Sequence, residues 1–236
     1  HIRYDVFIWI MVCFLGARTG ANAINRVIDA KFDALNHRTA GRQIPKGEIK
    51  AQEVILFTGT CFAIMVFGAY KLNTICLLLS PFALFFLILY SYTKRFTFLC
   101  HLVLGVTSAM APVGAWLAVT GSITIIPLVI GAANTLWVAG FDILYGAQDY
   151  AFDKEQGLHS IPVRFGVKNA LLIAKAFHTC SWCLLFILGM LSANLSTLYF
   201  VGLGIIALLF IAQHVMVSEN NLSLVKIASY SVNQCI

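Results

Sequence analysis

The sequence predicts an all-α fold, a polytopic bundle of transmembrane helices. Of the 236 residues, 60% are hydrophobic and only 11% are charged, whereas about 25% of the residues of a soluble domain are charged. Seven segments are apolar over roughly the 20 residues that a helix needs to cross a bilayer. An outer-membrane barrel would instead show alternating segments of about ten residues.

The seven predicted spans follow one another with short connections, except after the first and the fifth. A longer polar stretch comes after each of these two spans and carries most of the chain's charges. The predicted spans are Val6–Ile24, Val54–Tyr70, Thr74–Tyr92, Leu99–Thr120, Thr124–Tyr145, Ala170–Leu191 and Leu195–Val217.

Both ends of the sequence look cut, because it opens with His1 and stops in the apolar run "IASYSVNQCI". We therefore expect a single transmembrane domain over residues 1–236 that is truncated at both ends. The seven cysteines suggest no disulfide framework, since six lie in or beside hydrophobic segments. Cys180 and Cys183 form a CxxC inside an apolar helix and are expected to be packing residues.

The basic residues of the loops are distributed unevenly between the two sides of the membrane. Counting spans from Val6 places loops 26–53, 93–98 and 146–169 on one side. The other side carries only Arg3 and Lys71. Positively charged loops face the cytoplasm, so the long loops are predicted to be cytoplasmic. Their basic residues are Arg26, Lys31, Arg38, Arg42, Lys46, Lys50, Lys94, Arg95, Lys154, Arg164 and Lys168.

Acidic and amide side chains recur every four residues where the first span ends. If the helix continues past Ile24, Asn25, Asp29 and Asp33 lie on one face, and Arg18 lies on the same face two turns earlier. An ionisable residue inside a span costs about 2.5–3.5 kcal/mol. Arg18 is therefore expected to face the bundle interior or a polar cavity, with a structural ion pair as the alternative.

A second ladder of polar residues lies at the end of the fifth span. In "GFDILYGAQDYAFDKEQGLHSIP", one helical arc of about 80° would carry Asp142, Tyr145, Asp149 and Asp153. The first and fifth spans are separated by an even number of crossings. Both ladders should therefore emerge on the same side of the membrane.

Acids gathered in one small site repel each other unless a cation neutralises them. Magnesium prefers oxygen ligands and usually binds one or two carboxylates together with substrate phosphates. Two ladders on one side, surrounded by arginine and lysine, therefore predict a Mg²⁺–diphosphate site.

The remaining motifs are weaker signals. Gly16 and Gly20 form a GxxxG, which indicates close helix packing. The spans also hold histidines that look isolated and are not expected to bind metal, namely His101, His178 and His214.

The sequence resembles the UbiA-type intramembrane prenyltransferases. "NRVIDAKFDALNHRTAGRQIP" resembles their first signature, NxxxDxxxD with a following basic loop, and "DILYGAQDYAFDKEQGLHSIPVRFG" resembles their second. "YTKRFT" and "APVGAWLAVTG" also match. The resemblance implies nine helices around a central cavity in the full-length family. It also implies Mg²⁺-dependent transfer of a prenyl chain from an isoprenyl diphosphate to an aromatic or other lipophilic acceptor.

The resemblance also implies roles for individual residues. Asn25 would bind substrate beside metal-binding carboxylates, and the catalytic residues Asp142 and Tyr145 would lie nearer the reacting carbons. Arg18 is a candidate for the acceptor's carboxylate. The remaining assignments are metal binding by Asp29, Asp33, Asp149 and Asp153, and diphosphate binding by Arg38, Arg42 and Lys94.

Within the family, "GLHSIPVRFG" is most similar to the branch that prenylates 4-hydroxybenzoate in quinone biosynthesis. Naphthoate prenylation for menaquinone remains an alternative, and haem O and chlorophyll synthases match less well. From another class, a cation-coupled transporter would place its acids near the midplane, and a non-catalytic fragment is a third alternative. The expected partners are polyprenyl diphosphate, an aromatic acid and the bilayer of a bacterial inner membrane, with neither nucleic acid nor an obligate protein partner.

Overall fold

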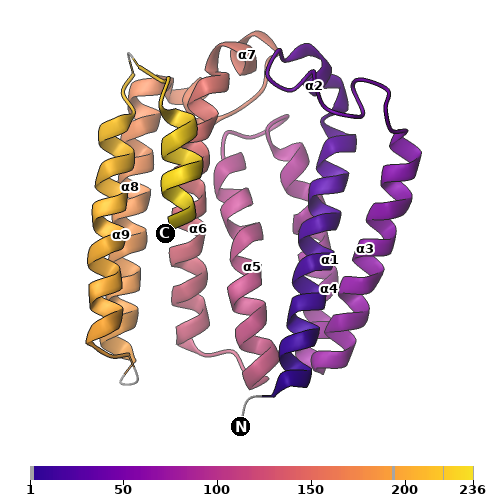
Figure 1. The fold of residues 1–236 in the computed structure, drawn as a ribbon, viewed down its shortest axis with the longest axis vertical. Helices are drawn as coiled ribbons and strands as arrows, with labels where there is room; N and C mark the ends of the chain where they lie inside the picture. Colours follow the sequence, from indigo (N-terminus) through magenta and orange to yellow (C-terminus); the bar gives the residue numbers. More distant parts are fainter. Residues whose placement is uncertain (1–2, 193–194, 220, 236) are drawn as a thin grey trace. The chain divides into compact units, whose positions relative to one another are not determined.

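The computed structural model describes residues 3–192, 195–219 and 221–235, and the described chain is almost entirely helical (Figure 1). Residues 1–2 and 193–194, which the sequence assigns to the less basic side, lie outside the described residues. The long helices are α1 (Tyr4–Ile28), α3 (Ala51–Leu72), α4 (Thr74–Thr93), α5 (Cys100–Thr120), α6 (Ile125–Gly146), α8 (Ile161–Leu191) and α9 (Thr197–Met216). The short elements are α2 (Ala30–Leu35), η1 (Ala147–Asp149), α7 (Tyr150–Glu155), η2 (Ile227–Val232) and η3 (Asn233–Cys235).

Seven of the described helices are long and apolar enough to cross a membrane. Each overlaps one predicted span, so the prediction of seven spans is confirmed. The helices run beyond the apolar segments at several ends. The largest extension is in α8, which begins at Ile161 rather than Ala170. This extension is interrupted by a kink at Gly166, where φ is 79° and ψ is 158°. Ser160 caps α8 by accepting from the Val163 amide, and Pro162 lies in its first turn, where a proline is tolerated.

The chain divides into two compact units. Unit 1 comprises His1–Tyr92 and Gly114–Ile123, and unit 2 comprises Thr93–Val113 and Thr124–Ile236. The first acidic ladder belongs to unit 1 and the second to unit 2. The single domain over residues 1–236 therefore stays a prediction.

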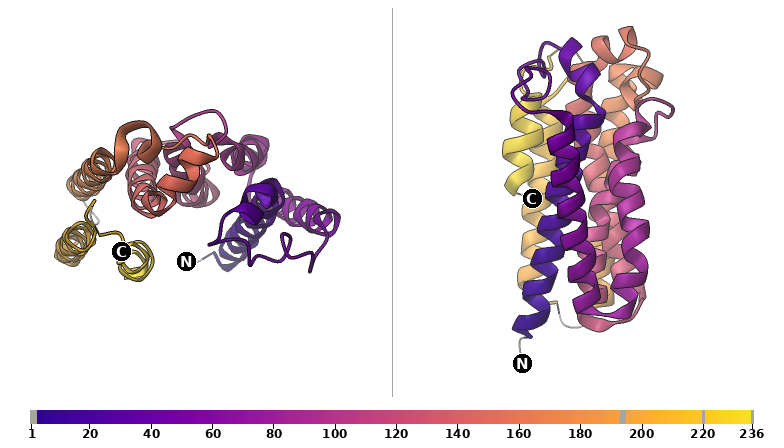
Figure 2. Two further views of the ribbon diagram at one scale, coloured as in Figure 1. Left: turned by 90° about the horizontal axis from the view of Figure 1, so that it is seen from above. Right: turned by 90° about the vertical axis from the view of Figure 1, so that its right-hand side faces the viewer.

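Unit 1 is built on the close packing of α1 against α3, which lie side by side in Figures 1 and 2. A Cβ atom at Gly16 would lie 2.7 Å from the Cys61 carbonyl oxygen, and one at Gly20 would lie 2.6 Å from the Phe62 ring. The GxxxG motif is therefore a helix-packing site, as predicted. Small residues allow such close approach, and dispersion contacts then stabilise helix pairs in lipid.

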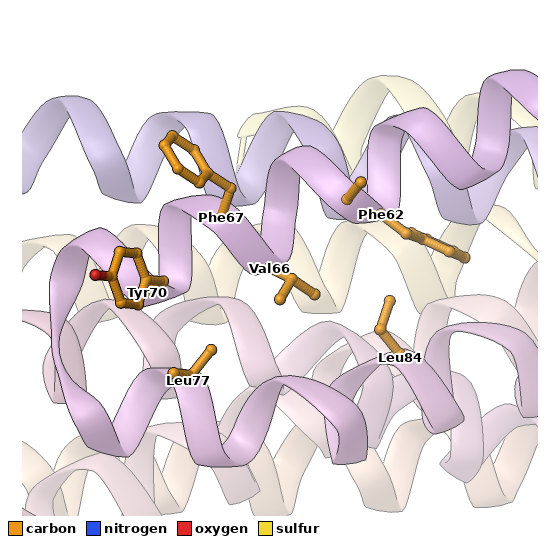
Figure 3. Close-up of a pocket in the computed structure, with 7 residues that line it drawn as sticks. Phe62, Val66, Phe67, Tyr70, Leu77 and Leu84 are labelled. Atoms are coloured by element: carbon orange, nitrogen blue, oxygen red, sulfur yellow. The ribbon is translucent and has the colours of Figure 1, made fainter.

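An open apolar groove lies on unit 1 between α3 and α4 (Figure 3). Its volume is about 600 Å³, and its lining carries no acid or base. Such a lining offers no partner to a charged diphosphate. The groove is lined by Phe62, Ala63, Val66, Phe67, Tyr70, Leu77 and Leu84.

Unit 2 is centred on the pair α6 and α8, which lie side by side in Figures 1 and 2. Their contact is made by fully buried small and aliphatic residues, which include Ile143, Leu144, Ala170 and Ala174. The C-terminal segment packs against α6 and α9. Two hydrogen bonds fasten it: Trp137 Nε1 donates to Asn233 Oδ1 over 2.9 Å, and Gln213 Nε2 donates to the Ala228 carbonyl over 3.1 Å.

We expect Gly16→Ala to destabilise the protein by about 1–3 kcal/mol, because the added methyl group would push against the backbone of α3. The measurement is thermal unfolding in detergent, and the matched control is Gly59→Ala in α3. No atom lies within 4 Å of a Cβ built at Gly59. The control should therefore be neutral, or stabilising by up to about 1 kcal/mol through helix propensity. Equal midpoints for the two variants would contradict the packing role.

Candidate diphosphate site

The first ladder begins at the end of α1, where Asn25 holds the Asp29 side chain. Asn25 Nδ2 donates to Asp29 Oδ2 over 2.8 Å and also contacts Ser91 Oγ of α4 over 3.2 Å. The amide thus orients the first carboxylate of the motif and ties α1 to α4. Asn25 and Asp29 were predicted to act together, and the structure places them in direct contact.

The ladder does not continue on one unbroken helix. Asp29 ends α1 and precedes α2, with φ −90° and ψ 1°. Its amide still donates to the Asn25 carbonyl, and the Asp33 amide still donates to the Asp29 carbonyl, over 2.9 and 2.8 Å. The expectation of a continuous helix was therefore wrong at Asp29. The four-residue hydrogen-bond spacing nevertheless persists across the break.

Asp33 is buried and is paired with Arg42. One guanidinium nitrogen, Nη1, lies 2.5 Å from both carboxylate oxygens. Only 6% of Asp33 is exposed, so a charged partner offsets the cost of its burial. The Thr39 hydroxyl donates to the Asp33 carbonyl over 3.1 Å, which folds the loop back over the motif.

Two further arginines of unit 1, Arg18 and Arg38, are exposed. Arg38 is exposed, and its backbone amide donates to Asn36 Oδ1 over 2.9 Å. Arg18 is exposed on α1, with its guanidinium carbon 5.8 Å from the centroid of the Phe14 ring. A polar environment for Arg18 and its role toward an acceptor carboxylate stay predictions.

The second ladder is also divided among successive elements. Asp142 lies in α6, Asp149 ends the short helix η1, and Asp153 lies in α7. The chain stays helical from Asp142 to Asp153 but passes through the 3₁₀ turn η1. The placement of the four residues on one arc stays a prediction. Tyr145 lies one turn after Asp142, and its carbonyl accepts from Gln148 Nε2 over 3.2 Å.

Asp153 is the buried carboxylate of the second ladder, and its partner is Lys94. Lys94 Nζ donates to Asp153 Oδ2 over 2.9 Å, and the Asp153 side chain is 2% exposed. Burial alone would lower the pKa of Lys94, but the Asp153 carboxylate raises it above its ordinary value of 10.5. The lysine backbone is also held, because its carbonyl accepts from the His159 amide over 2.6 Å.

The two ladders thus share an arrangement within their separate units. In each, the last aspartate is buried and paired with a cation that the sequence assigns to diphosphate binding: Arg42 for Asp33 and Lys94 for Asp153. The convergence of the two ladders on one site stays a prediction.

The oxygen donors of both ladders fit magnesium. Within the described residues, no group of three or more His, Cys, Asp or Glu side chains is arranged to hold a metal ion alone. Magnesium does not need such a cage, because it keeps several waters and binds one or two carboxylates together with substrate phosphates. The Asn25 amide and the Asp29 carboxylate in unit 1, and the Asp149 carboxylate in unit 2, carry oxygen donors of this kind.

The histidines that looked isolated in the sequence are not isolated in the structure. His101 Nδ1 lies 2.7 Å from Asp142 Oδ2, and His178 Nδ1 lies 3.0 Å from His214 Nε2. The partners are separated by 41 and 36 residues, so no local spacing could have revealed them. His101 is thereby placed beside a candidate catalytic residue that the sequence had identified without it.

The seven long apolar helices, two of which end in acidic motifs, define an integral membrane protein. The model of the UbiA prenyltransferase family matches residues 1–229. The chain belongs to the UbiA prenyltransferase family.

The chain is similar to two bacterial proteins named 4-hydroxybenzoate octaprenyltransferase. The relative from Marinobacter nauticus is 29% identical over 205 residues, which are 86% of this chain and 69% of the relative. The relative from Tolumonas auensis is 32% identical over 196 residues, which are 83% of this chain and 68% of the relative.

Two solved structures of UbiA homologs share the fold. The apo structure of the homolog from Aeropyrum pernix K1 is 31% identical, with a TM-score of 0.90 over 100% of this chain and 88% of that chain. The homolog from Archaeoglobus fulgidus, bound to GPP and Mg²⁺, is 22% identical. Its TM-score is 0.71, and the match covers 98% of this chain and 86% of that one.

We expect Lys94→Gln to destabilise the protein by about 1–3 kcal/mol, because the Asp153 carboxylate would stay buried without its cation. The folded pKa of Lys94 is raised, so this contribution is complete below the ordinary pKa of 10.5 that lysine has in the unfolded state. It is lost only as pH rises through the raised value. The loss should therefore be equal at about pH 7 and pH 9 in thermal unfolding.

Lys154→Gln is the matched control, since Lys154 lies next to Asp153 in the chain but is exposed, and its midpoint should hardly change. The double variant Lys94→Gln/Asp153→Asn should lose less stability than the sum of its single variants. Strict additivity would show that the two side chains do not depend on each other.

Proposed function

We propose that the protein transfers a polyprenyl group from an isoprenyl diphosphate to a hydroxylated aromatic acid, with 4-hydroxybenzoate as the acceptor, in quinone biosynthesis. The observation that carries the proposal is the ion pair at the end of each motif. A buried aspartate is paired with Arg42 in the first motif and with Lys94 in the second. The names of the bacterial relatives support the acceptor, and the ligands of the Archaeoglobus fulgidus homolog support the donor.

One set of residues would bind the metal and the diphosphate of the prenyl donor. Asn25 orients Asp29. Asp29 and Asp33 of the first motif and Asp149 and Asp153 of the second would hold the metal. Bound Mg²⁺ would supply neutralisation of the leaving diphosphate, so that the allylic C–O bond can ionise. Arg42, Lys94 and Arg38 would then bind diphosphate oxygens.

If Arg42 and Lys94 bind the diphosphate, they must give up the aspartates with which they are paired. Arg42 is paired with Asp33, and Lys94 is paired with Asp153. A metal-bound diphosphate would take the cations, and the freed carboxylates would take the metal. The site would therefore bind the two ligands together, since either one alone would leave a buried charge unpaired.

The acceptor would be handled by residues of the spans. The carbon ortho to the phenol attacks the allylic cation, and the ring then loses a proton. Asp142 and Tyr145 would lie nearest the reacting carbons, where an anionic oxygen can stabilise the cation or accept this proton. Arg18 would bind the acceptor's carboxylate. The surrounding helices would exclude water, which would otherwise quench the cation.

The proposed location is a bacterial inner membrane, with both ladders at its cytoplasmic face. The basic loops after the first and fifth spans support this orientation. The bacterial relatives support the choice of membrane.

The test of the proposed function is an assay of the protein in membranes with geranyl diphosphate and Mg²⁺. The acceptors would be 4-hydroxybenzoate and 1,4-dihydroxy-2-naphthoate, with mass detection of the product. Prenylated 4-hydroxybenzoate and released diphosphate are expected. If only the naphthoate were prenylated, the acceptor would be a naphthoate and the pathway would be menaquinone synthesis. Cation movement without any Mg²⁺-dependent release of diphosphate would favour a transporter.

We expect Asp29→Asn to lower prenyl transfer on the order of 10²-fold or more, because a metal-binding charge is removed at almost constant size. Asp149→Asn should do the same. The double variant should be much less impaired than the product of the two effects, because residues that act as one unit are non-additive. Initial rates over a Mg²⁺ titration measure this.

Glu155→Gln is the control, since Glu155 is an exposed acid beside the second motif and should leave the rate almost unchanged. Near-normal turnover in either single variant, in folded and membrane-inserted protein, would end the metal-site proposal.

A further inference from the structure

His101 and Asp142 form a buried contact between α5 and α6, inside unit 2. His101 Nδ1 lies 2.7 Å from Asp142 Oδ2. The two side chains differ in burial: that of His101 is 1% exposed and that of Asp142 is 25% exposed. The carboxylate therefore stands at the edge of a cavity or surface, and the imidazole lies behind it.

The imidazole ring has little freedom to turn away from this carboxylate. A Cβ atom at Gly146 would lie 3.1 Å from His101 Cε1, so the ring is tightly packed against α6 at this glycine. The other ring nitrogen, Nε2, is buried and finds no hydrogen-bond partner in the described parts of the chain. Burying an imidazole with one unsatisfied nitrogen is costly, and the contact to Asp142 offsets part of this cost.

The contact also fixes where the ring proton lies. An ionised carboxylate only accepts hydrogen bonds, so Nδ1 must be the donor. A neutral His101 is then the Nδ1–H tautomer, with its lone pair on Nε2. The bond occupies Oδ2 of Asp142 and leaves Oδ1 as the oxygen that His101 does not use.

We propose that His101 is a positioning residue for prenyl transfer: its hydrogen bond holds the Asp142 carboxylate in one rotamer, with Oδ1 turned toward the reacting carbons. The proposal rests on the proposed function, which places Asp142 beside those carbons. A purely structural His101 would merely fill the space between α5 and α6. The two roles differ in whether the hydrogen bond, rather than the volume of the ring, matters for the reaction.

Replacing His101 by Asn or Leu separates the hydrogen bond from the volume. In His101→Asn the amide nitrogen can occupy a place close to Nδ1 and donate to Asp142. His101→Leu fills similar space and cannot donate. His159→Asn is the matched control, since the His159 side chain is exposed and its contacts with Lys94 and Cys100 are made by the backbone.

We expect His101→Leu to lower the single-turnover rate of prenyl transfer about 10-fold to 100-fold, the usual effect of losing a hydrogen bond to a charged group. His101→Asn should stay within about 5-fold of the unmodified protein, and the control should be unchanged. The affinity for an unreactive geranyl thiolodiphosphate with Mg²⁺ should vary by less than about 3-fold in all of them, because Asp142 acts on the reacting carbons. Equal rates for the Asn and Leu variants would overturn the proposal.

A spectroscopic measurement tests the contact without any turnover. In protein labelled with ¹⁵N-histidine, the signals lost in His101→Asn identify this ring, and they should show a protonated, strongly hydrogen-bonded Nδ1. Asp142→Asn should shift that signal, whereas an unshifted signal would overturn the proposal. If the unmodified protein transferred no prenyl group to any acceptor, the proposed function would fail, while this spectrum would still decide whether His101 holds Asp142.

Discussion

A carboxylate that is buried at the end of an apolar helix must be neutralised, and this requirement organises the polar part of the molecule. Three buried or half-buried aspartates have basic partners within hydrogen-bond distance: Asp33 with Arg42, Asp153 with Lys94 and Asp142 with His101. Removing one partner of such a pair costs more than the pair contributes, because a buried charge is left alone. The loops and helix ends that supply these partners are therefore tied to the motifs.

The same pairs suit the motifs to a substrate that carries its own charge. A basic side chain that is paired with a carboxylate can pair with a phosphate instead. The carboxylate can then bind a metal ion. In the proposed function, this exchange would keep each buried group paired at every stage. The apolar helices, in contrast, are held by shape: Gly16 and Gly20 bring α1 against α3, and small residues bring α6 against α8. Rigid packing and exchangeable charge thus lie in different parts of each unit.

Most of the helical architecture could be read from the sequence, because the length and apolar character of a span are local properties. The ladders could also be read, since a spacing of four residues is visible in any helix. The breaks at Asp29 and after Gly146 could not be read, because neither follows from a proline or a strong turn signal. The partners of Asp33 and Asp153 were identified as basic residues, but with diphosphate rather than aspartate as their expected contact.

The histidines show where local reasoning fails. His101 looked like a lone polar residue in an apolar run, and its role depends on a carboxylate 41 residues away. His178 likewise meets His214 from another span. Contacts between spans are decided by the packing of whole helices, which in lipid follows from small residues and shape rather than from a polar pattern. The sequence therefore predicted the important acidic residues, but it did not predict the side chains that contact them.

The central claim is that both ladders hold metal and diphosphate in one site, and electron paramagnetic resonance of bound Mn²⁺ tests it most directly. Manganese accepts the same oxygen ligands as magnesium, and geranyl thiolodiphosphate supplies the anion without reacting. With one metal at each ladder and the diphosphate between them, the ions would lie about 3.5–4 Å apart, as metals in paired sites do. The account therefore predicts a spin-coupled Mn²⁺ pair that disappears in both Asp29→Asn and Asp149→Asn. Uncoupled Mn²⁺, or a coupled pair that survives either substitution, would contradict it.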